Sequence, residues 1–244
     1  MKQVAQHHKD IFRHVLQHFD VDPSVRSCGF DGDEEPFDLA YFPGAPRETT
    51  TTFMTLGLSD VLASDGGDER FEIVATTPSK LLAFDEVVMF GAHLATEDPA
   101  RVQPGTVIEK LVATRYSKAN AAHAYFTDKP LLGTSIAPTR AKGKKVTFLW
   151  LVPVTSAELA FLEANGRDAF ERRLSAAGAK LVDPERKDLA PAATKKVPAT
   201  KKAPAKKKAP AKKKAPAKKK APGKKKAPAK KKTPAKKKTP AKKK

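Results

Sequence analysis

The N-terminal residues repeat apolar side chains at the period of an α-helix. Between residues 4 and 19, valine, isoleucine, leucine and phenylalanine recur at helical intervals, and charged residues and glutamines occupy the positions between them. At about 100° per residue, this spacing gathers the apolar side chains in one arc. We therefore expect an amphipathic helix that packs against a core.

Three segments further along the chain have the composition of β-strands. Residues 50–56 and 71–76 are rich in β-branched and aromatic residues, and the Asp and Gly residues at 65–68 supply turn chemistry between them. Residues 146–152, VTFLWLV, form a continuous apolar run that is typical of a strand buried on both faces. We expect Pro153 to end this strand.

Two helical patterns accompany these strands. Residues 79–96 carry apolar side chains at helical spacing between Pro78 and Pro99, which predicts a second core helix. Thr155 and Glu158 have the spacing of a capping box, in which each side chain bonds to the backbone of the other residue. Val154 and Leu159 would form the accompanying hydrophobic staple.

The capped helix is expected to end at Asn165-Gly166, where glycine favours a left-handed stop, and a last helix over residues 168–177 closes the domain. Together these elements predict an α/β (α+β) fold with a single mixed sheet and flanking helices.

The charge of the chain is divided between two very different segments. The sequence has 47 Lys and Arg against 27 Asp and Glu, and 25 of the lysines lie in residues 191–244, which contain no acidic residue. The first 190 residues therefore keep 22 basic against 27 acidic side chains. A chain of that length can bury roughly 70% of its unfolded surface, enough for one core. We expect a globular domain over residues 1–190 and a basic tail over residues 191–244.

The tail repeats Ala-Pro-Ala-Lys-Lys-Lys with a six-residue period that prolines mark from Pro204 to Pro240. Ordering each residue costs about 1–2 kcal/mol of backbone entropy, and no large apolar side chain is present to offset that cost. Regular proline also prevents a helix. We expect this segment to be disordered when free and to favour extended, polyproline-like geometry.

The tail lysines predict sequence-independent binding of nucleic acid. At about 3.1 Å per residue, each repeat spreads three ammonium groups over roughly 19 Å, whereas duplex DNA offers a phosphate every ~1.7 Å. The tail has no arginine, asparagine, glutamine or aromatic residue with which to read or stack on bases. The candidate binding residues are Lys201, Lys202, Lys206, Lys207, Lys208, Lys212, Lys213, Lys214, Lys218, Lys219, Lys220, Lys224, Lys225, Lys226, Lys230, Lys231, Lys232, Lys236, Lys237 and Lys238.

The composition of the tail resembles the Ala-Lys-Pro tails of linker histones and bacterial histone-like proteins. The alternatives are a solubilising segment or one that binds acidic lipid surfaces, since polylysine is attracted to those as well. Neither an amphipathic helix nor a lipidation site flanks the repeat, which favours nucleic acid.

Two groups of residues suggest metal sites but fit them poorly. His7, His14 and His18 lie along one border of the first predicted helix, yet three ligands spread over three turns of a straight helix cannot surround one ion; His14 and His18 could form half a site. The acidic residues at 31–35, after Cys28, lack the spacing of a calcium loop, so residues 28–35 are expected to form a solvated loop. We expect no metal and no cofactor.

Enzymatic activity is not indicated either. Ser59, Cys28, His93 and His123 are residue types that nucleophilic catalysis uses, but none stands in a recognised frame. The sequence has no G-x-S-x-G elbow, no phosphate-binding loop, no G-x-G-x-x-G and no Cys-x-x-Cys. The alternative is a triad assembled in space, for which a pocket near Ser59, Cys28 or His123 would be the sign.

Two blocks of the sequence resemble the suppressor-of-fused (SUFU) domain family. They are TTTTFMTLGLSD, residues 49–60, and VTFLWLVPVTSAELAFLEANGRDAF, residues 146–170. The segment RFEIVATT and residues 182–186 also agree, so the resemblance spans roughly residues 30–190. It implies a module without a catalytic centre that binds a protein: a transcription-factor peptide in animals, toxin domains in bacterial relatives of the immunity type.

These observations predict a binding protein of the bacterial type, whose body recognises an unidentified protein partner while the tail binds nucleic acid. The alternative is a nucleoid protein whose tail carries the function and whose body is passive. A single cysteine indicates a reducing compartment, and neither a signal peptide nor a transmembrane segment is visible. We expect a cytoplasmic protein, which the tail could bring to the nucleoid.

Overall fold

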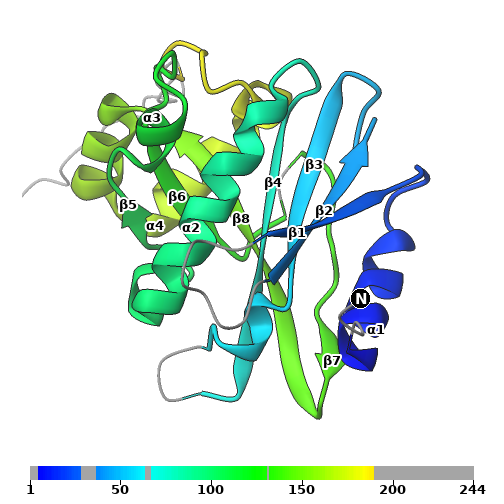
Figure 1. Cartoon of the computed structure of the whole chain (residues 1–244). Coiled ribbons are helices and arrows are strands. Elements are labelled where there is room, and N and C mark those ends of the chain that lie inside the picture. Colours follow the sequence, from blue (N-terminus) through cyan, green and yellow to red (C-terminus); the bar gives the residue numbers. More distant parts are fainter. Residues whose placement is uncertain (1–4, 29–36, 64–66, 131, 190–244) are drawn as a thin grey trace, which may run out of the picture. The chain divides into compact units, whose positions relative to one another are not determined.

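The computed structural model describes residues 5–28, 37–63, 67–130 and 132–189, which form a sheet covered by helices (Figure 1). The eight strands run in the order β1-β2-β3-β4-β8-β6-β5, and β7 pairs with β8 outside that path. Along the chain the elements are α1 (Gln6–Leu16), β1 (Ser24–Cys28), β2 (Phe37–Pro43), β3 (Thr50–Leu56), η1 (Leu58–Asp60), β4 (Glu69–Pro78), η2 (Leu82–Phe84), α2 (Asp85–Glu97), η3 (Pro99–Arg101), β5 (Val107–Ile108), α3 (Leu111–Arg115), β6 (His123–Thr127), β7 (Thr139–Ala141), β8 (Lys144–Val154), α4 (Ser156–Ala177) and η4 (Gly178–Val182).

The sheet is mixed, as the sequence predicts. β4 and β8 pair in parallel at its centre, and every other pairing between the described strands is antiparallel. β8 is buried without interruption from Val146 to Val154, which confirms the prediction of a strand covered on both faces. The expectation that Pro153 ends this strand is wrong: Pro153 lies within β8, opposite Ala124 of β6. β8 no longer pairs with β4 beyond Trp150, so a residue without an N–H is tolerated there as on an edge strand.

Two apolar cores lie on the two faces of the sheet. Leu149 and Leu151 of β8 pack in one core with α2 and α3, whereas Phe148 and Trp150 pack in the other with α1 and α4. The alternation follows from the two-residue period of a strand, and Figure 1 shows α2 and α3 together over one face.

The predicted helices are present with shifted ends. The first predicted helix begins at Gln6 and ends at Leu16, and the second begins only at Asp85, because the 3₁₀ turn η2 precedes it. Gly166 interrupts α4 with a φ of 77°, a conformation that glycine adopts without strain, so the predicted stop appears as a kink between two helical halves. Cys28 is buried at the end of β1 and not in the loop that the sequence predicts. The acidic positions that follow it, and part of the predicted turn at 65–68, lie outside the described residues.

The predicted capping box forms, and its glutamate also binds the end of the folded body. Glu158 is fully buried and accepts a bond from the Thr155 backbone N–H at 3.1 Å. The guanidinium of Arg186 donates to both Glu158 carboxylate oxygens, at 2.6 and 2.8 Å, and the Leu189 N–H donates to one of them at 3.0 Å. Arg186 also donates to the carbonyl of Pro153. One carboxylate thus holds together the end of β8, the start of α4 and the segment after η4.

We expect Arg186→Leu to lower the free energy of unfolding by about 3–5 kcal/mol, because it leaves the Glu158 charge buried without its partner. Urea unfolding of the variant and the wild type measures this difference. Arg172→Leu is the matched control, since Arg172 is an exposed arginine on α4, the helix that carries Glu158. Equal losses in the two variants would contradict the role of the buried pair.

Candidate functional site

The turn that follows β3 is fixed by hydrogen bonds to a buried carboxylate. Glu72 of β4 is fully buried and accepts the backbone N–H groups of Gly57 and Ser59 at 3.0 and 3.1 Å. Its other oxygen accepts the hydroxyl of Thr55 at 2.6 Å. These bonds fix the path of residues 57–59 and so determine where the next residue, Asp60, presents its side chain.

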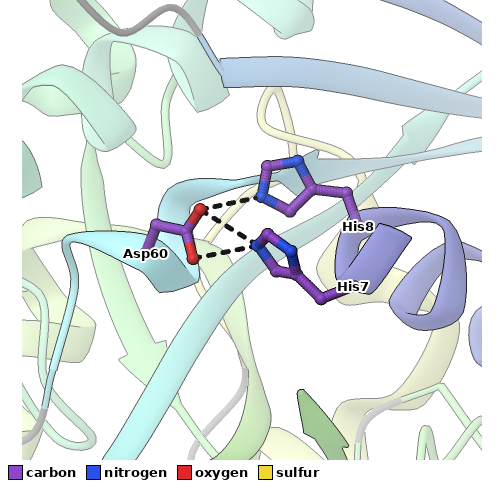
Figure 2. Close-up of side chains that lie close together, drawn as sticks. All are labelled: His7, His8 and Asp60. Atoms are coloured by element: carbon purple, nitrogen blue, oxygen red, sulfur yellow. Dashed lines mark hydrogen bonds and ion pairs between the residues drawn. The ribbon is translucent and has the colours of Figure 1, made fainter. Parts of the chain in front are cut away.

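The start of α1 brings two histidines to this turn. Figure 2 shows both imidazoles directed at the Asp60 carboxylate. The Nε2 atom of His7 lies 3.0 Å from each carboxylate oxygen, and that of His8 lies 3.0 Å from one of them. The two rings are edge to face with centroids 4.1 Å apart, so their Nε2 atoms converge on the same group.

The close approach of His8 depends on Gly57. Gly57 has a φ of 103°, and a Cβ placed there would lie 2.9 Å from Cε1 of His8. A side chain at this position would be strained and would displace the imidazole ring. Gly57 therefore permits α1 to lie against the turn.

Cations surround the same carboxylate. Lys142, in the turn between β7 and β8, places its Nζ 3.1 Å from Asp60. Burial alone would raise the pKa of Asp60, but the hydrogen bonds from Lys142, His7 and His8 outweigh it and hold that pKa below its usual range. An open cavity of about 370 Å³ adjoins the group, and Arg70 and Lys144 also line it.

The residues considered for catalysis do not form a nucleophilic relay. His123 contacts the hydroxyl of Ser156 at 3.0 Å through Nε2, but its Nδ1 accepts the backbone N–H of Lys110 at 3.2 Å. The proton of a neutral His123 is therefore on Nε2, which donates to Ser156 and cannot act as its base.

The other candidates have separate roles. Ser59 lines the cavity beside Asp60, so the pocket expected near it for a spatial triad is present, but Ser59 itself is buried in the turn on Glu72. His93 pairs with Glu97 on α2 at 3.4 Å. Cys28 is buried, and burial raises the pKa of its thiol, which keeps it in the unreactive form.

The histidines of α1 and of the residues just after it do not form the group of His7, His14 and His18 that the sequence suggests. His14 contacts the carbonyl oxygen of Ala137 at 2.7 Å, its ring stacks on Phe148, and His18 meets it edge to face. His7 instead joins His8 and Asp60. The consecutive histidines His7 and His8 are the one sign of this cluster in the sequence. Asp60 is 53 residues from His7, and no local pattern connects them.

The tail lysines, from Lys201 to Lys238, lie outside the described residues, so their role remains a prediction. No helix among the described residues is long and apolar enough to span a membrane.

One edge of the sheet is exposed. Ser24 to Ser27 of β1 are exposed, and Val25 has 48% of its surface accessible. Among the described strands only β2 pairs with β1, so its second edge has no strand partner there. Arg26, in the middle of β1, donates to Asp85 at 2.7 Å, and Tyr41 of β2 donates to the same carboxylate oxygen.

The described residues thus form a mixed sheet with helices on both faces and an exposed edge strand, and the candidate residues among them form no serine–histidine relay. The chain belongs to the suppressor of fused protein (SUFU) family, whose model matches residues 33–187. This finding confirms the resemblance and the fold that the sequence predicts.

Among individual relatives, the immunity protein YqcF of Bacillus subtilis (strain 168) is 25% identical over 189 residues, which cover 76% of this chain and 98% of that protein. The crystal structure of a putative SUFU homolog from Neisseria gonorrhoeae FA 1090 has a similar fold, with a TM-score of 0.58 and 16% identity over 76% of this chain and 96% of that one.

Two further solved structures share the fold. The Sufu–Fu complex matches with a TM-score of 0.55 and 13% identity, covering 73% of this chain and 90% of that one. Drosophila Suppressor of Fused matches with a TM-score of 0.54 and 14% identity, covering 72% of this chain but only 49% of that one.

Glu72 gives a testable pH dependence. Burial outweighs its hydrogen bonds and raises its pKa from 4.5 to about 7, so the folded protein keeps a proton that the unfolded chain has already lost. As the pH rises from about 4.5 to about 7, wild type should lose stability relative to Glu72→Gln, by at most about 1.4 kcal/mol per pH unit. Urea unfolding at several pH values measures the difference.

Glu163→Gln serves as the control because Glu163 is exposed on α4. The assignment fails if Glu72→Gln and wild type follow parallel stability curves across this pH range.

Proposed function

We propose that residues 1–190 form a non-enzymatic protein-binding module of the toxin-immunity type, and that the lysine-rich tail holds this module close to nucleic acid. The observation that carries the proposal is the similarity to an immunity protein along 98% of that protein's length. A second relative is named for a complex with another protein, Sufu with Fu, which supports a protein partner here.

The chemistry of the body is consistent with binding rather than turnover. His123, whose Nε2 lies 3.0 Å from the Ser156 hydroxyl, is oriented by Lys110 so that it donates to Ser156 rather than removing its proton. The conspicuous carboxylates Glu72 and Glu158 have their hydrogen-bonding capacity taken up by the fold itself. Inhibition of a toxin needs only a stable surface, and this rigid sheet supplies one.

We propose the exposed edge of β1 as the surface for the partner. An unpaired strand edge offers a row of backbone donors and acceptors to an extended segment of another protein. Val25 adds exposed apolar area at that edge. The Arg26–Asp85–Tyr41 contacts anchor the strand to α2, so the edge is held ready in one conformation.

The tail contributes proximity rather than specificity. Lysines spaced along a chain that has little to bury release counterions from a phosphate backbone without contacting base edges. Tethering the body to nucleic acid raises its effective concentration there, which would favour a partner that acts on nucleic acid.

Growth rescue tests the immunity role. Proteins encoded beside this gene are expressed singly in a bacterial host, and any that arrests growth is co-expressed with the full chain or with residues 1–190. We expect both forms to restore growth, because the body carries recognition. Val25→Lys should weaken partner binding at least about tenfold, equivalent to about 1.4 kcal/mol, by charging the proposed edge.

Val61→Lys is the control for that variant, since Val61 is an exposed apolar residue, 42% accessible, in the turn after β3. If the neighbouring proteins are harmless, or the body does not protect against a harmful one, the immunity role is rejected. Nucleic-acid binding without any protein partner would favour the nucleoid protein with a passive body.

Salt-dependent chromatography tests the tail. We expect truncation after residue 190 to abolish retention on heparin and DNA columns, because the remaining body carries more acidic than basic side chains. For the full chain, about ten engaged lysines give a log–log salt slope of about −9 with duplex DNA. A tail of unchanged length with glutamine in place of lysine separates charge from chain length. Retention that survives truncation or ignores added sodium chloride refutes the proposal.

A further inference from the structure

The cluster formed by His7, His8 and Asp60 has the composition of a transition-metal site. Two imidazole nitrogens and a carboxylate oxygen are a ligand set that zinc and related divalent ions use in proteins. The three ligand atoms lie within 4.8 Å of one another. They come from two separate elements, the first turn of α1 and the end of η1, and both imidazoles point at the carboxylate (Figure 2).

The surrounding structure holds these ligands in place. Glu72 fixes the turn that carries Asp60 by accepting the N–H groups of Gly57 and Ser59, and the absence of a side chain at Gly57 leaves room for the His8 ring. Supporting bonds of this kind orient ligands in established metal sites. The two residues that do this supporting work, Glu72 and Gly57, belong to the sheet and to the turn rather than to the helix that carries the histidines.

The distances fit an ion after a small expansion. A tetrahedral ion with bonds of about 2.0–2.2 Å places its ligand atoms about 3.3–3.6 Å apart. The Nε2 atoms of His7 and His8 now lie 3.0 Å from Asp60, at the spacing of direct hydrogen bonds. A metal would replace the two imidazole protons and move the side chains apart by a few tenths of an ångström. The adjoining cavity of about 370 Å³ leaves the fourth position open to water.

The positive charge of Lys142 disfavours such an ion most directly. Its ammonium lies 3.1 Å from Asp60, and its side chain is 59% exposed, so it can turn into solvent when a second cation arrives. Arg70 and Lys144 line the same cavity and also disfavour a cation there. The charge around the cluster therefore lowers metal affinity, and removal of the Lys142 charge should raise it.

We propose that His7, His8 and Asp60 bind zinc or a similar divalent transition-metal ion, which joins α1 to the turn after β3. The helix precedes the residues that match the SUFU family, whereas Asp60 lies within them. The ion would thus fasten the N-terminal helix to the part of the fold that the family model matches. This inference does not depend on the proposed immunity function.

Zinc titration of the full chain by calorimetry tests the site, with the thermal unfolding midpoint as a second readout. We expect one ion per chain and a midpoint that rises with zinc. His7→Gln and Asp60→Asn should each raise the dissociation constant at least about tenfold, and Lys142→Met should lower it. His18→Gln, which alters a histidine near the end of the same helix but outside the cluster, should leave it unchanged.

Binding that persists in Asp60→Asn would place the ion elsewhere and overturn the proposal, as would the absence of stoichiometric binding in wild type. The direction of the Lys142→Met effect guards against variants that fail to fold, because it predicts tighter binding. Affinity unchanged in Lys142→Met would also contradict an ion at Asp60.

Discussion

The packing of the last part of the fold depends on one interaction, the hydrogen bonding of the buried Glu158 carboxylate. Glu158 is fully buried, and an isolated charge there would cost several kcal/mol. Its bonds to Thr155, Arg186 and Leu189 offset that cost, and they do so only if β8, α4 and the last described residues come together. The segment after α4 is therefore part of the domain rather than an extension of the tail, and the domain can end only after Leu189 has reached this position.

A second buried carboxylate lies within the central strand pair. Glu72 pairs in register with Phe148, near the middle of β8, whereas Glu158 follows the end of β8. Glu72 organises a turn rather than a helix, and the turn presents Asp60 at the surface. Glu158 therefore fixes the end of the domain, whereas Glu72 fixes the turn against which α1 lies.

Sequence reasoning succeeded where the determining interactions are local or strongly periodic. The strand over residues 50–56 and the Thr155–Glu158 capping box were predicted as they occur, because each depends on neighbouring residues. β1, β6 and α3 were missed, since elements of five residues are stabilised mainly by partners distant in the chain. Glu72, a charged residue within an apolar strand, is the local sign of a buried hydrogen-bonded carboxylate. The cluster at Asp60 could not be foreseen, because β1, β2 and β3 all lie between its members in sequence.

The hydrogen bond between Leu189 and Glu158 has a mechanical consequence. The chain continues from the last described residue into the tail, so any tension on the tail reaches the body at Leu189. That load falls first on a bonded cluster shared by β8 and α4, where several bonds must stretch together, rather than on a frayed terminus that opens one bond at a time. The body should consequently resist a pull on its C-terminal end with several bonds at once, because Arg186 and Leu189 both bond to Glu158.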